Sequence, residues 1–302
     1  MALPTAQLAT LLAIADHGTF EAAARAQQIT PSAVSQRVRA LETAVGQVLV
    51  QRTSPCRPTA AGEVVLRLAR QHQLLAAEAD RELGHTGLTT ELAVAVNADS
   101  LSTWFRTVVT EVGSWDGVAL RLHVEDQAFS ADLLRRGEVL AAITSDPTPV
   151  QGCRVTPLGS MRYRPAATPQ LADLWQKGRG LDWERMPVIV LNEKDDLQHR
   201  VLARHGVEAP ALWHRVPTAG DFAAAIRLGL GWGMLPESQL DPWLADGSVV
   251  MLGRDVVDVP LHWMRWRIDS QVLDRLGEAV TTAARAALRR PRVSTTDPEP
   301  KA

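Results

Sequence analysis

The sequence predicts an α/β protein with an all-helical N-terminal segment, a long connecting helix and two α/β lobes. Three patterns support this fold class. Short helical patterns joined by tight turns occupy residues 4–58, one uninterrupted helical pattern covers residues 59–83, and strands alternate with helices from residue 89 onward. A chain of 302 residues with 46% hydrophobic side chains is large enough for two or three domains with cores of their own.

Composition and charge narrow the class of protein. The sequence contains neither an apolar run of about 18 residues nor a leader, so we expect a cytoplasmic protein without membrane association. Cys56 and Cys153 lie in unrelated segments without metal-ligand spacing, so we expect no disulfide, metal or cofactor. Residues 20–57 carry five arginines against two glutamates, a local charge of +3 in a chain of net charge −2. A basic segment of this kind fits phosphate binding at one end of the molecule.

The first strong local signal is a helix that starts at Thr30. The Thr30 hydroxyl can accept a free backbone N–H, and Pro31 is favoured in the first helical turn. One face of the helix is apolar, formed by Val34, Val38, Leu41 and Val45. This face can pack on a preceding helix over residues 19–27, where three consecutive alanines permit close approach.

The opposite face of this helix is polar and almost free of acidic residues. In a helix-turn-helix protein such a face enters the major groove, where Gln pairs with adenine, Arg with guanine and Ser with bases or phosphates. Arg52 follows in a turn, where a wing would reach the DNA backbone or the minor groove. The alternative is an ordinary solvated helix, which the capped start and the local basicity disfavour. The predicted DNA-binding residues are Thr30, Pro31, Ser32, Ser35, Gln36, Arg37, Arg39 and Arg52.

The long helix begins after Pro58, with Thr59 as the expected N-cap. Apolar and half-apolar residues recur along it near coiled-coil spacing. A single linker helix cannot bury such a stripe by itself, so we expect a dimer seam formed by Val65, Leu68, His72 and Leu75.

The remaining sequence predicts two βαβ successions and therefore parallel sheets. In the first lobe we expect strands at 91–97, 118–124 and 139–144, with helices at 101–112 and 131–136. In the second we expect strands at 187–191 and 232–235 around a helix at 222–228 that ends near Gly231. A final helix covers 270–289, and the tail at 291–302 has a composition typical of disorder.

Carboxylates and hydroxyls gather after the strands of both lobes, where ligands bind in open α/β sheets. A cationic ligand needs such carboxylates, and Ser100 with the N–H groups that follow it can hold an anionic group of the same ligand. The alternative is that these residues are helix N-caps and loop charges. The predicted effector-binding residues are Asp99, Ser100, Glu125, Asp126, Asp146, Asp195, Asp196, Thr218 and Asp221.

The residues at 20–62 resemble a known family. Six stretches closely resemble the winged helix-turn-helix of LysR-type transcriptional regulators. They are Ala22-Ala23, Thr30-Pro-Ser-Ala-Val-Ser-Gln-Arg-Val38, Leu41-Glu42, Val45-Gly46, Leu49-Val-Gln-Arg52 and Thr59-Ala-Ala-Gly62. The resemblance extends over the chain except its tail, and it departs from the family at Val50, where phenylalanine is common. It implies a two-lobed, periplasmic-binding-protein-like effector domain.

Within this family, four segments of the chain look like those of regulators of basic amino-acid export. They are VNADSLSTWF (96–105), VEDQ (124–127), LLRRGEVLAAIT (133–144) and LNEKDDLQ (191–198). This subgroup resemblance implies L-lysine or L-arginine as effector, a double-stranded DNA operator, RNA polymerase as a partner, and a homodimer or homotetramer.

The implied domains are a winged helix-turn-helix at 1–58, a linker helix at 59–88, and an effector domain at 89–290. Lobe I of the effector domain covers about 89–163 plus 268–290, and lobe II covers about 164–267.

The residues favour a transcriptional regulator of this subgroup over three alternative functions. An enzyme is disfavoured because the sequence contains no G-x-S-x-G, H-E-x-x-H or P-loop motif. An architectural or replication-inhibiting DNA-binding protein would leave the acidic lobes without a role, and it would bind DNA with a steep salt dependence but no preferred operator. A regulator that senses a different metabolite, such as an anion, is disfavoured by the carboxylates at the strand ends.

Overall fold

The computed structural model describes residues 3–85, 89–124, 130–193 and 195–290. The chain forms two compact units. Unit 1 is drawn from residues 1–97, 108–156 and 263–279, and unit 2 from residues 98–107, 157–262 and 280–302. Each unit is therefore assembled from segments that are distant in sequence.

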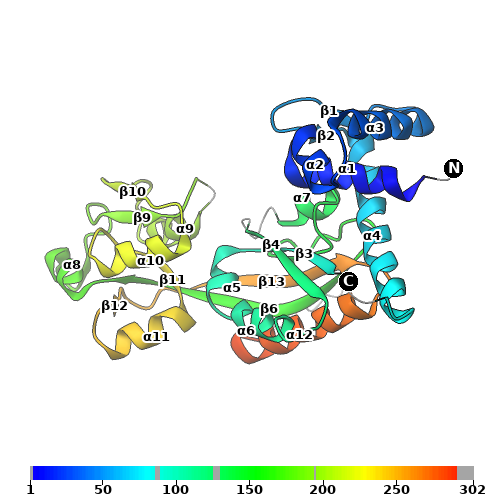
Figure 1. Cartoon of the computed structure of the whole chain (residues 1–302). Helices are drawn as coiled ribbons and strands as arrows, with labels where there is room; N and C mark the ends of the chain where they lie inside the picture. The colour runs from blue at the N-terminus through cyan, green and yellow to red at the C-terminus, as the bar shows by residue number, and fades with distance from the viewer. Residues whose placement is uncertain (1–2, 86–88, 125–129, 194, 291–302) are drawn as a thin grey trace, which may run out of the picture. The chain divides into compact units, whose positions relative to one another are not determined.

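The first half of the chain contains most of unit 1 (Figure 1). Its elements are α1 (Thr5–His17), α2 (Phe20–Ala26), α3 (Pro31–Val45), β1 (Val50–Gln51), β2 (Arg57–Pro58), α4 (Ala60–Glu82), β3 (Thr90–Val96), α5 (Ala98–Ser102), α6 (Phe105–Val112), β4 (Val118–Val124), α7 (Ser130–Arg135) and β5 (Ala141–Thr144).

The second half contains most of unit 2. Its elements are β6 (Cys153–Ala167), α8 (Pro169–Leu174), β7 (Gln176–Lys177), β8 (Gly180–Leu181), β9 (Val188–Val190), α9 (Leu197–Arg204), β10 (Trp213–Arg215), α10 (Ala219–Arg227), β11 (Gly233–Pro236), α11 (Glu237–Ala245), β12 (Val250–Met251), β13 (Val257–Trp266) and α12 (Gln271–Ala287). Among the helices that the structure describes, none has the length and apolarity needed to cross a bilayer.

Helices α1, α2 and α3 pack together in a segment that we call the head, residues 3–58, and the start of α4 packs against this segment (Figure 1). Leu11, Leu41 and Leu49 are fully buried in its core, together with Leu66 of α4. The expected apolar face of α3 is confirmed, since Val34, Val38 and Leu41 are buried. The short hairpin of β1 and β2 follows α3, as a wing requires.

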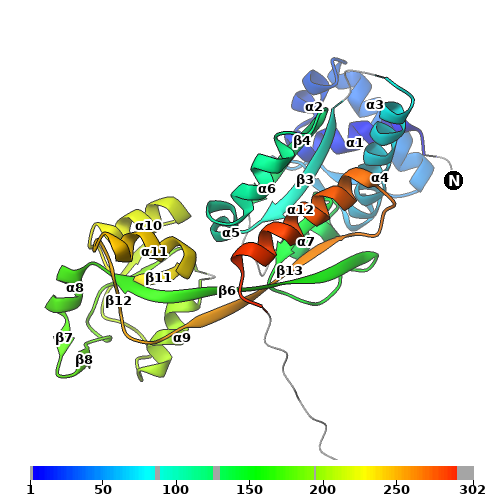
Figure 2. The ribbon, with the colours of Figure 1, turned by 90° about the horizontal axis from the view of Figure 1, so that it is seen from below.

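The long helix is also confirmed. The Thr59 hydroxyl accepts a hydrogen bond from the Gly62 backbone N–H, and α4 continues without interruption to Glu82. At its far end, Glu78 accepts hydrogen bonds from the Ser270 hydroxyl and the Val272 N–H at the start of α12. Figure 2 shows this end of α4 beside the first turns of α12.

In unit 1 the predicted parallel sheet is confirmed. Strand β3 lies between β4 and β5 and is parallel to both. Its residues Leu92–Val96 are fully buried because the strand has neighbours on both sides and α7 packs against it. Such burial explains the continuous apolar run in the sequence.

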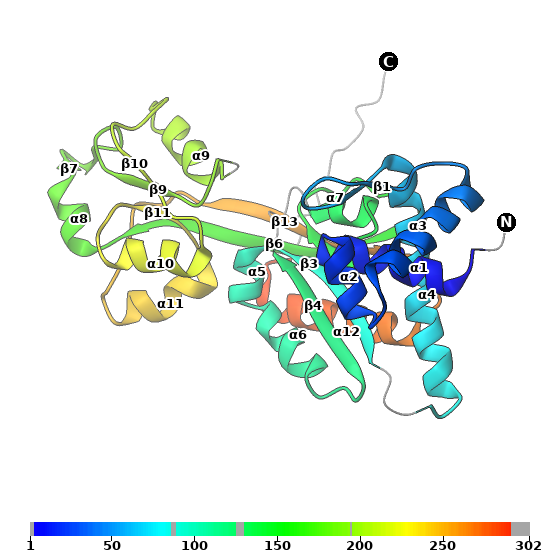
Figure 3. The same ribbon diagram turned by 45° about the horizontal axis from the view of Figure 1, so that its top comes forward.

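In unit 2 the predicted parallel relation of the strands at 187–191 and 232–235 is confirmed, since Val188 forms a parallel bridge with Trp232. Strands β9 and β10 are also parallel, whereas β11 and β12 pair antiparallel with β6, a strand that the sequence did not predict. The sequence did not predict β6 because Pro157, Gly159 and Pro165 interrupt its alternating pattern. Figure 3 shows α10 and α11 near β11.

Two predicted helix boundaries also need correction. The expected helix at 101–112 is two helices, α5 and α6, because the Ser102 and Thr103 hydroxyls bond the Asp99 carbonyl oxygen and compete with the helical pattern. The glycine that follows α10 in the left-handed conformation is Gly229, with φ of 79°, rather than Gly231. A Cβ on Gly231 would lie 2.7 Å from the Pro187 carbonyl oxygen, so Gly231 permits a close backbone approach.

Gly62 is a comparable close approach in the head. A Cβ at this position would lie 2.0 Å from the Leu49 carbonyl oxygen, which is backbone and cannot rotate away. The first turn of α4 therefore packs directly on the end of the α3–β1 segment.

We expect Gly62→Ala to lower the free energy of unfolding by about 1–3 kcal/mol, because the backbone must shift to admit the methyl group. Calorimetric unfolding measures the change. Gly220→Ala is the matched control, since Gly220 also lies in a first helical turn but has no atom within 4 Å of its added Cβ. An equal change in both variants would contradict the role of the close packing.

Candidate DNA interface and effector site

The N-terminal half of α3 presents the predicted polar face to solvent. The Thr30 hydroxyl accepts the Ala33 N–H at 3.1 Å, so the helix starts at Pro31 as expected. The side chains of Ser32, Gln36 and Arg39 are exposed, and that of Ser35 is half-buried. Because their apolar neighbours face the head core, these side chains are free to meet base edges.

Arg37 has a different environment from its neighbours. Its Nη1 donates to Thr10 Oγ1 of α1 at 3.4 Å and to the Gln27 side-chain oxygen at 3.5 Å. Thr10 is fully buried and also donates to Gln27 at 2.8 Å. Arg37 thus braces α3 against the two preceding helices, an arrangement in which part of its donor capacity is used inside the head.

Arg52 is exposed just after β1, in the predicted wing. Its guanidinium carbon lies 4.8 Å from the centroid of the Phe20 ring, a cation–π distance. The ring holds the stem of the side chain on the surface while the charge remains available to an anionic partner.

The predicted dimer seam divides into two groups. Leu68, His72 and Leu75 of α4 are exposed, whereas Val65 is 5% exposed and packs in the core of the head. Val65 is therefore corrected to a core residue, because the helices of its own chain already cover it. Val64, at 55% exposure, lies on the open side of α4 one turn before Leu68.

The predicted effector residues do not all fall in one described region. Glu125 and Asp126 lie outside the described residues, and Asp146 belongs to unit 1. The Asp146 carboxylate accepts the Thr148 N–H at 2.9 Å, so it stabilises a turn after β5. The remaining candidates belong to unit 2.

Among these candidates, Asp99 and Ser100 make side-chain hydrogen bonds with two buried aromatic residues. The Asp99 Oδ2 accepts a hydrogen bond of 2.7 Å from the Tyr163 hydroxyl, and Tyr163 is 1% exposed on β6. Ser100 is fully buried, and its Oγ accepts the Trp104 indole N–H at 3.0 Å. These bonds fix a carboxylate and a hydroxyl at the start of α5, directly after β3. Sequence reasoning missed Tyr163 because β6 was not predicted.

Asp195 supports its own loop. Its carboxylate accepts the backbone N–H groups of Leu191 at 3.0 Å and Leu197 at 3.3 Å. Burial raises the pKa of Asp195, and the two backbone hydrogen bonds oppose this shift without cancelling it. Asp196 is exposed and pairs with Arg200 one turn along α9, at 2.8 Å.

Thr218 and Asp221 form a reciprocal helix cap. The Thr218 hydroxyl accepts the Asp221 N–H at 3.2 Å and donates to the Asp221 carboxylate at 2.6 Å. They open α10, which packs against α5 in the same unit. This cap gives both residues a structural role at the start of α10.

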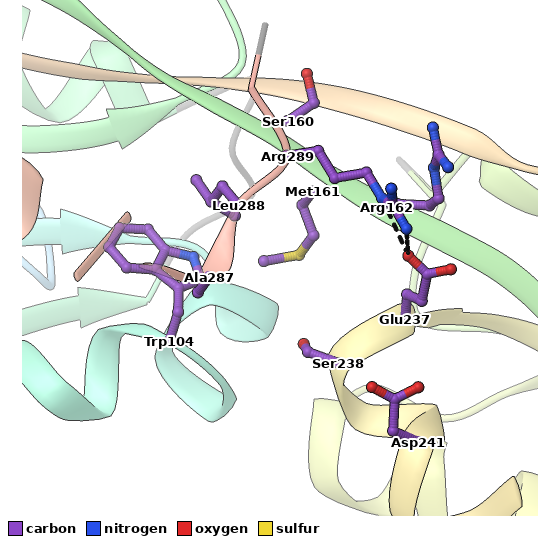
Figure 4. Close-up of a pocket in the computed structure, with 10 residues that line it drawn as sticks. All are labelled: Trp104, Ser160, Met161, Arg162, Glu237, Ser238, Asp241, Ala287, Leu288 and Arg289. Carbon is purple, nitrogen blue, oxygen red and sulfur yellow. Dashed lines mark hydrogen bonds and ion pairs between the residues drawn. The ribbon is translucent and has the colours of Figure 1, made fainter. Parts of the chain in front are cut away.

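Unit 2 also contains a cavity of about 400 Å³ beside the C-terminal end of α12 (Figure 4). Glu237 lies at the wall of this cavity, and its carboxylate accepts a hydrogen bond of 2.6 Å from the Arg289 guanidinium. The Arg164 guanidinium lies 3.6 Å from the same carboxylate. None of the predicted effector residues that the structure describes lines this cavity. The charged residues that line the cavity are two arginines, Arg162 and Arg289, and two carboxylates, Glu237 and Asp241, so the lining is balanced in charge rather than acidic.

Two family profiles match the chain. Residues 5–63 match the bacterial regulatory helix-turn-helix protein, lysR family, and residues 85–287 match the LysR substrate binding domain. The first match contains α1 to α3, the wing and the start of α4; the second contains the α/β elements.

The chain is also similar to individual proteins over nearly its whole length. It is 51% identical to the lysine export transcriptional regulatory protein LysG of Corynebacterium efficiens, over 93% of this chain and 98% of that protein. It is 38% identical to the HTH-type transcriptional regulator ArgP of Pseudomonas aeruginosa, over 92% of this chain and 94% of that protein.

Among solved structures, full-length LysG from Corynebacterium glutamicum with bound effector Arg has a TM-score of 0.76 and 49% identity, covering 95% of this chain and 99% of its own. ArgP from Mycobacterium tuberculosis has a TM-score of 0.82 and 44% identity, covering 94% and 98%. Since both profiles and these relatives match nearly the entire chain, the protein belongs to the LysR family of bacterial regulatory helix-turn-helix proteins.

Proposed function

We propose that this protein is a DNA-binding transcriptional regulator that senses a basic amino acid, L-lysine or L-arginine, and controls the gene of an amino-acid exporter. The exposed, capped polar face of α3 is the observation that carries the DNA-binding part. The similarity to LysG, whose structure holds the effector Arg, supports the effector class. The similarity to proteins named as lysine export regulators supports the exporter gene as target.

DNA reading begins at the N-terminus of α3. Gln36 and Arg39 present an amide and a guanidinium that can make bidentate contacts with adenine and guanine in the major groove. The free N–H groups at the start of the helix attract a phosphate, and Arg52 adds a charge at the wing. Arg37 contributes by holding α3 in place, and Thr30 and Pro31 set where the helix starts.

Assembly follows from the exposed side of α4. Val64, Leu68 and Leu75 recur at spacings of four and seven residues and leave apolar surface in solvent. Pairing of two α4 helices would bury this stripe and place two α3 helices for a two-fold symmetric operator. The proposal is therefore a homodimer that can pair further to a homotetramer.

Effector recognition is proposed at the start of α5. The Asp99 carboxylate would receive a cationic group of the ligand, and Ser100 with the N–H groups of α5 would hold its α-carboxylate. Binding would favour one arrangement of lobes and subunits, and so alter how the operator and RNA polymerase are engaged. The protein would act in the cytoplasm, by binding rather than by catalysis.

Two alternatives differ in what they predict for ligand and DNA. A LysR-type regulator of another metabolite would bind its operator specifically but would not bind lysine or arginine. An architectural DNA-binding protein would show little sequence preference. Calorimetric titration of the full chain with L-lysine and L-arginine, and with L-glutamate as opposite-charge control, separates the first alternative. Selection from random DNA separates the second.

We expect Gln36→Ala to reduce discrimination at one base position by about 1–3 kcal/mol, because an amide contact with a base edge is lost. Operator affinity and affinity for scrambled DNA are measured in parallel. An equal loss on both DNAs would show that Gln36 does not read sequence.

Arg52→Ala should behave differently. It should weaken binding to operator and scrambled DNA alike, and it should reduce the slope of log affinity against log salt by about one, since one phosphate contact is removed. Retention of the wild-type salt slope would place Arg52 away from the phosphates.

Asp99→Asn should raise the Kd of the basic amino acid by roughly 10–100-fold, because a charge-assisted hydrogen bond to the ligand's cationic group is lost. Operator affinity without effector should not change. Asp80→Asn is the matched control, since Asp80 is exposed on α4 and pairs with His85. Unchanged ligand affinity in Asp99→Asn would remove Asp99 from the site.

A further inference from the structure

Arg70 is a charged side chain at a position where an apolar one would be expected. It lies on the inner side of α4 and is 4% exposed, next to the apolar core residue Ala69. Burying a guanidinium is unfavourable unless its donors are satisfied by well-placed acceptors. The partners of Arg70 come from elements that are far apart in the sequence of unit 1.

The first partner is Asp16, in the last turn of α1. Arg70 Nη2 donates to Asp16 Oδ1 at 2.6 Å, and Nη1 donates to Oδ2 at 3.1 Å, which is a two-bond arrangement of planar groups. Burial by itself would raise the pKa of Asp16, but the hydrogen bonds and charges of Arg70 and Arg121 outweigh it and hold that pKa below its usual value. Asp16 is therefore an ionised carboxylate inside the protein.

The second group of partners belongs to the sheet. Arg121 on β4 donates to Asp16 Oδ1 at 2.9 Å, and its Nε lies 3.1 Å from Glu91 of β3. Glu91 lies 3.8 Å from Arg70, and the Arg70 Nε donates to the Gly137 carbonyl oxygen at 3.5 Å. Two arginines and two carboxylates thus join α1, α4, β3 and β4, and we call these four residues the charge cluster.

The charge cluster is poorly explained by stability alone. Replacing a buried ion pair with apolar residues of similar volume is often neutral or stabilising, because desolvation offsets the attraction. The two-bond geometry instead defines an orientation, since it is satisfied in one arrangement of the partners. The neighbouring contact between α4 and the lobe is also close: a Cβ on Gly137 would lie 2.6 Å from the Arg67 backbone nitrogen.

From this geometry we infer that Arg70 is a positioning residue that fixes the orientation of the DNA-binding head on the β3–β4 edge of its own unit, and thereby the operator half-site spacing that the assembled protein accepts. This inference rests on the proposed function. Strand β3 leads along the chain from Glu91 directly into α5, which carries Asp99. Because β3 is continuous along the chain with α5, we expect effector binding to be coupled to the charge cluster.

The test compares Asp16→Asn and Arg70→Met with the wild-type full chain. Asp16→Asn removes the charge while it keeps the side-chain volume and one acceptor. Arg135→Met is the matched control, since Arg135 belongs to the same unit but forms an exposed ion pair with Asp132. An operator selected by the wild type from random DNA is then prepared with spacers lengthened or shortened by one or two base pairs, and as an isolated half-site.

We expect the wild type and Arg135→Met to prefer one spacer by roughly 10-fold, a difference of about 1.4 kcal/mol. The two charge-cluster variants should bind all spacers within about twofold and should bind the isolated half-site as the wild type does. A substitution that only lowers the stability of the protein would reduce the affinity for every DNA by the same factor. Charge-cluster variants that keep the wild-type spacer preference would overturn the inference.

A second measurement addresses the effector. In Asp16→Asn the ratio of operator affinities with and without the basic amino acid should fall towards one, while the Kd for that amino acid without DNA stays unchanged. A wild type that binds neither lysine nor arginine would refute the proposed ligand, and the spacer experiment, which contains no effector, would still decide the role of Arg70. A wild type that selects no operator would refute both.

Discussion

Burial of the inner face of α4 is the constraint on which the other features of unit 1 depend. A helix of this length must cover its apolar side, and α4 covers Val65, Leu66 and Ala69 with the helices of the head. The same packing turns Leu68 and Leu75 outward and leaves them available to a second copy. It also encloses Arg70, which then requires Asp16 and the sheet as partners. One helix thus determines the head core, the open apolar stripe and the charge cluster.

The carboxylates show how local chemistry can imitate a binding site. The Asp146 and Asp195 carboxylates accept backbone N–H groups of their own loops, and the Asp221 carboxylate accepts the hydroxyl of Thr218 at the start of its own helix. These are the ordinary uses of Asp in turns and caps. Asp99 differs, because its described partner is the hydroxyl of a residue 64 positions away in sequence. A carboxylate held by a distant element is more specific evidence of a shaped site than a carboxylate held by its own turn.

The exposed polar face of α3 was predictable because its signals are local. The Thr30 cap, Pro31 and the apolar stripe of α3 follow from neighbouring residues, and the structure confirms each of them. The parallel strands β3, β4 and β5 were also predictable, since fully buried strands retain continuous apolar runs. Strand β6 was not predictable, because its prolines and glycine interrupt the alternating pattern of a strand. The antiparallel pairing of β11 and the position of Tyr163 depend on β6, so they were not predicted either.

The sequence by itself determined the fold class, the family, the start of α3, the extent of α4, and the side chains that face outward from α3, because caps and helical periodicity depend on residues a few positions apart. Only the tertiary structure decided that Val65 belongs to the core, that Arg37 braces α3, and that Asp16, Arg70, Glu91 and Arg121 meet. These outcomes depend on which faces pack together and on which charges are buried with partners. No local pattern records that information, since a buried arginine and an exposed one have the same spacing in an amphipathic helix.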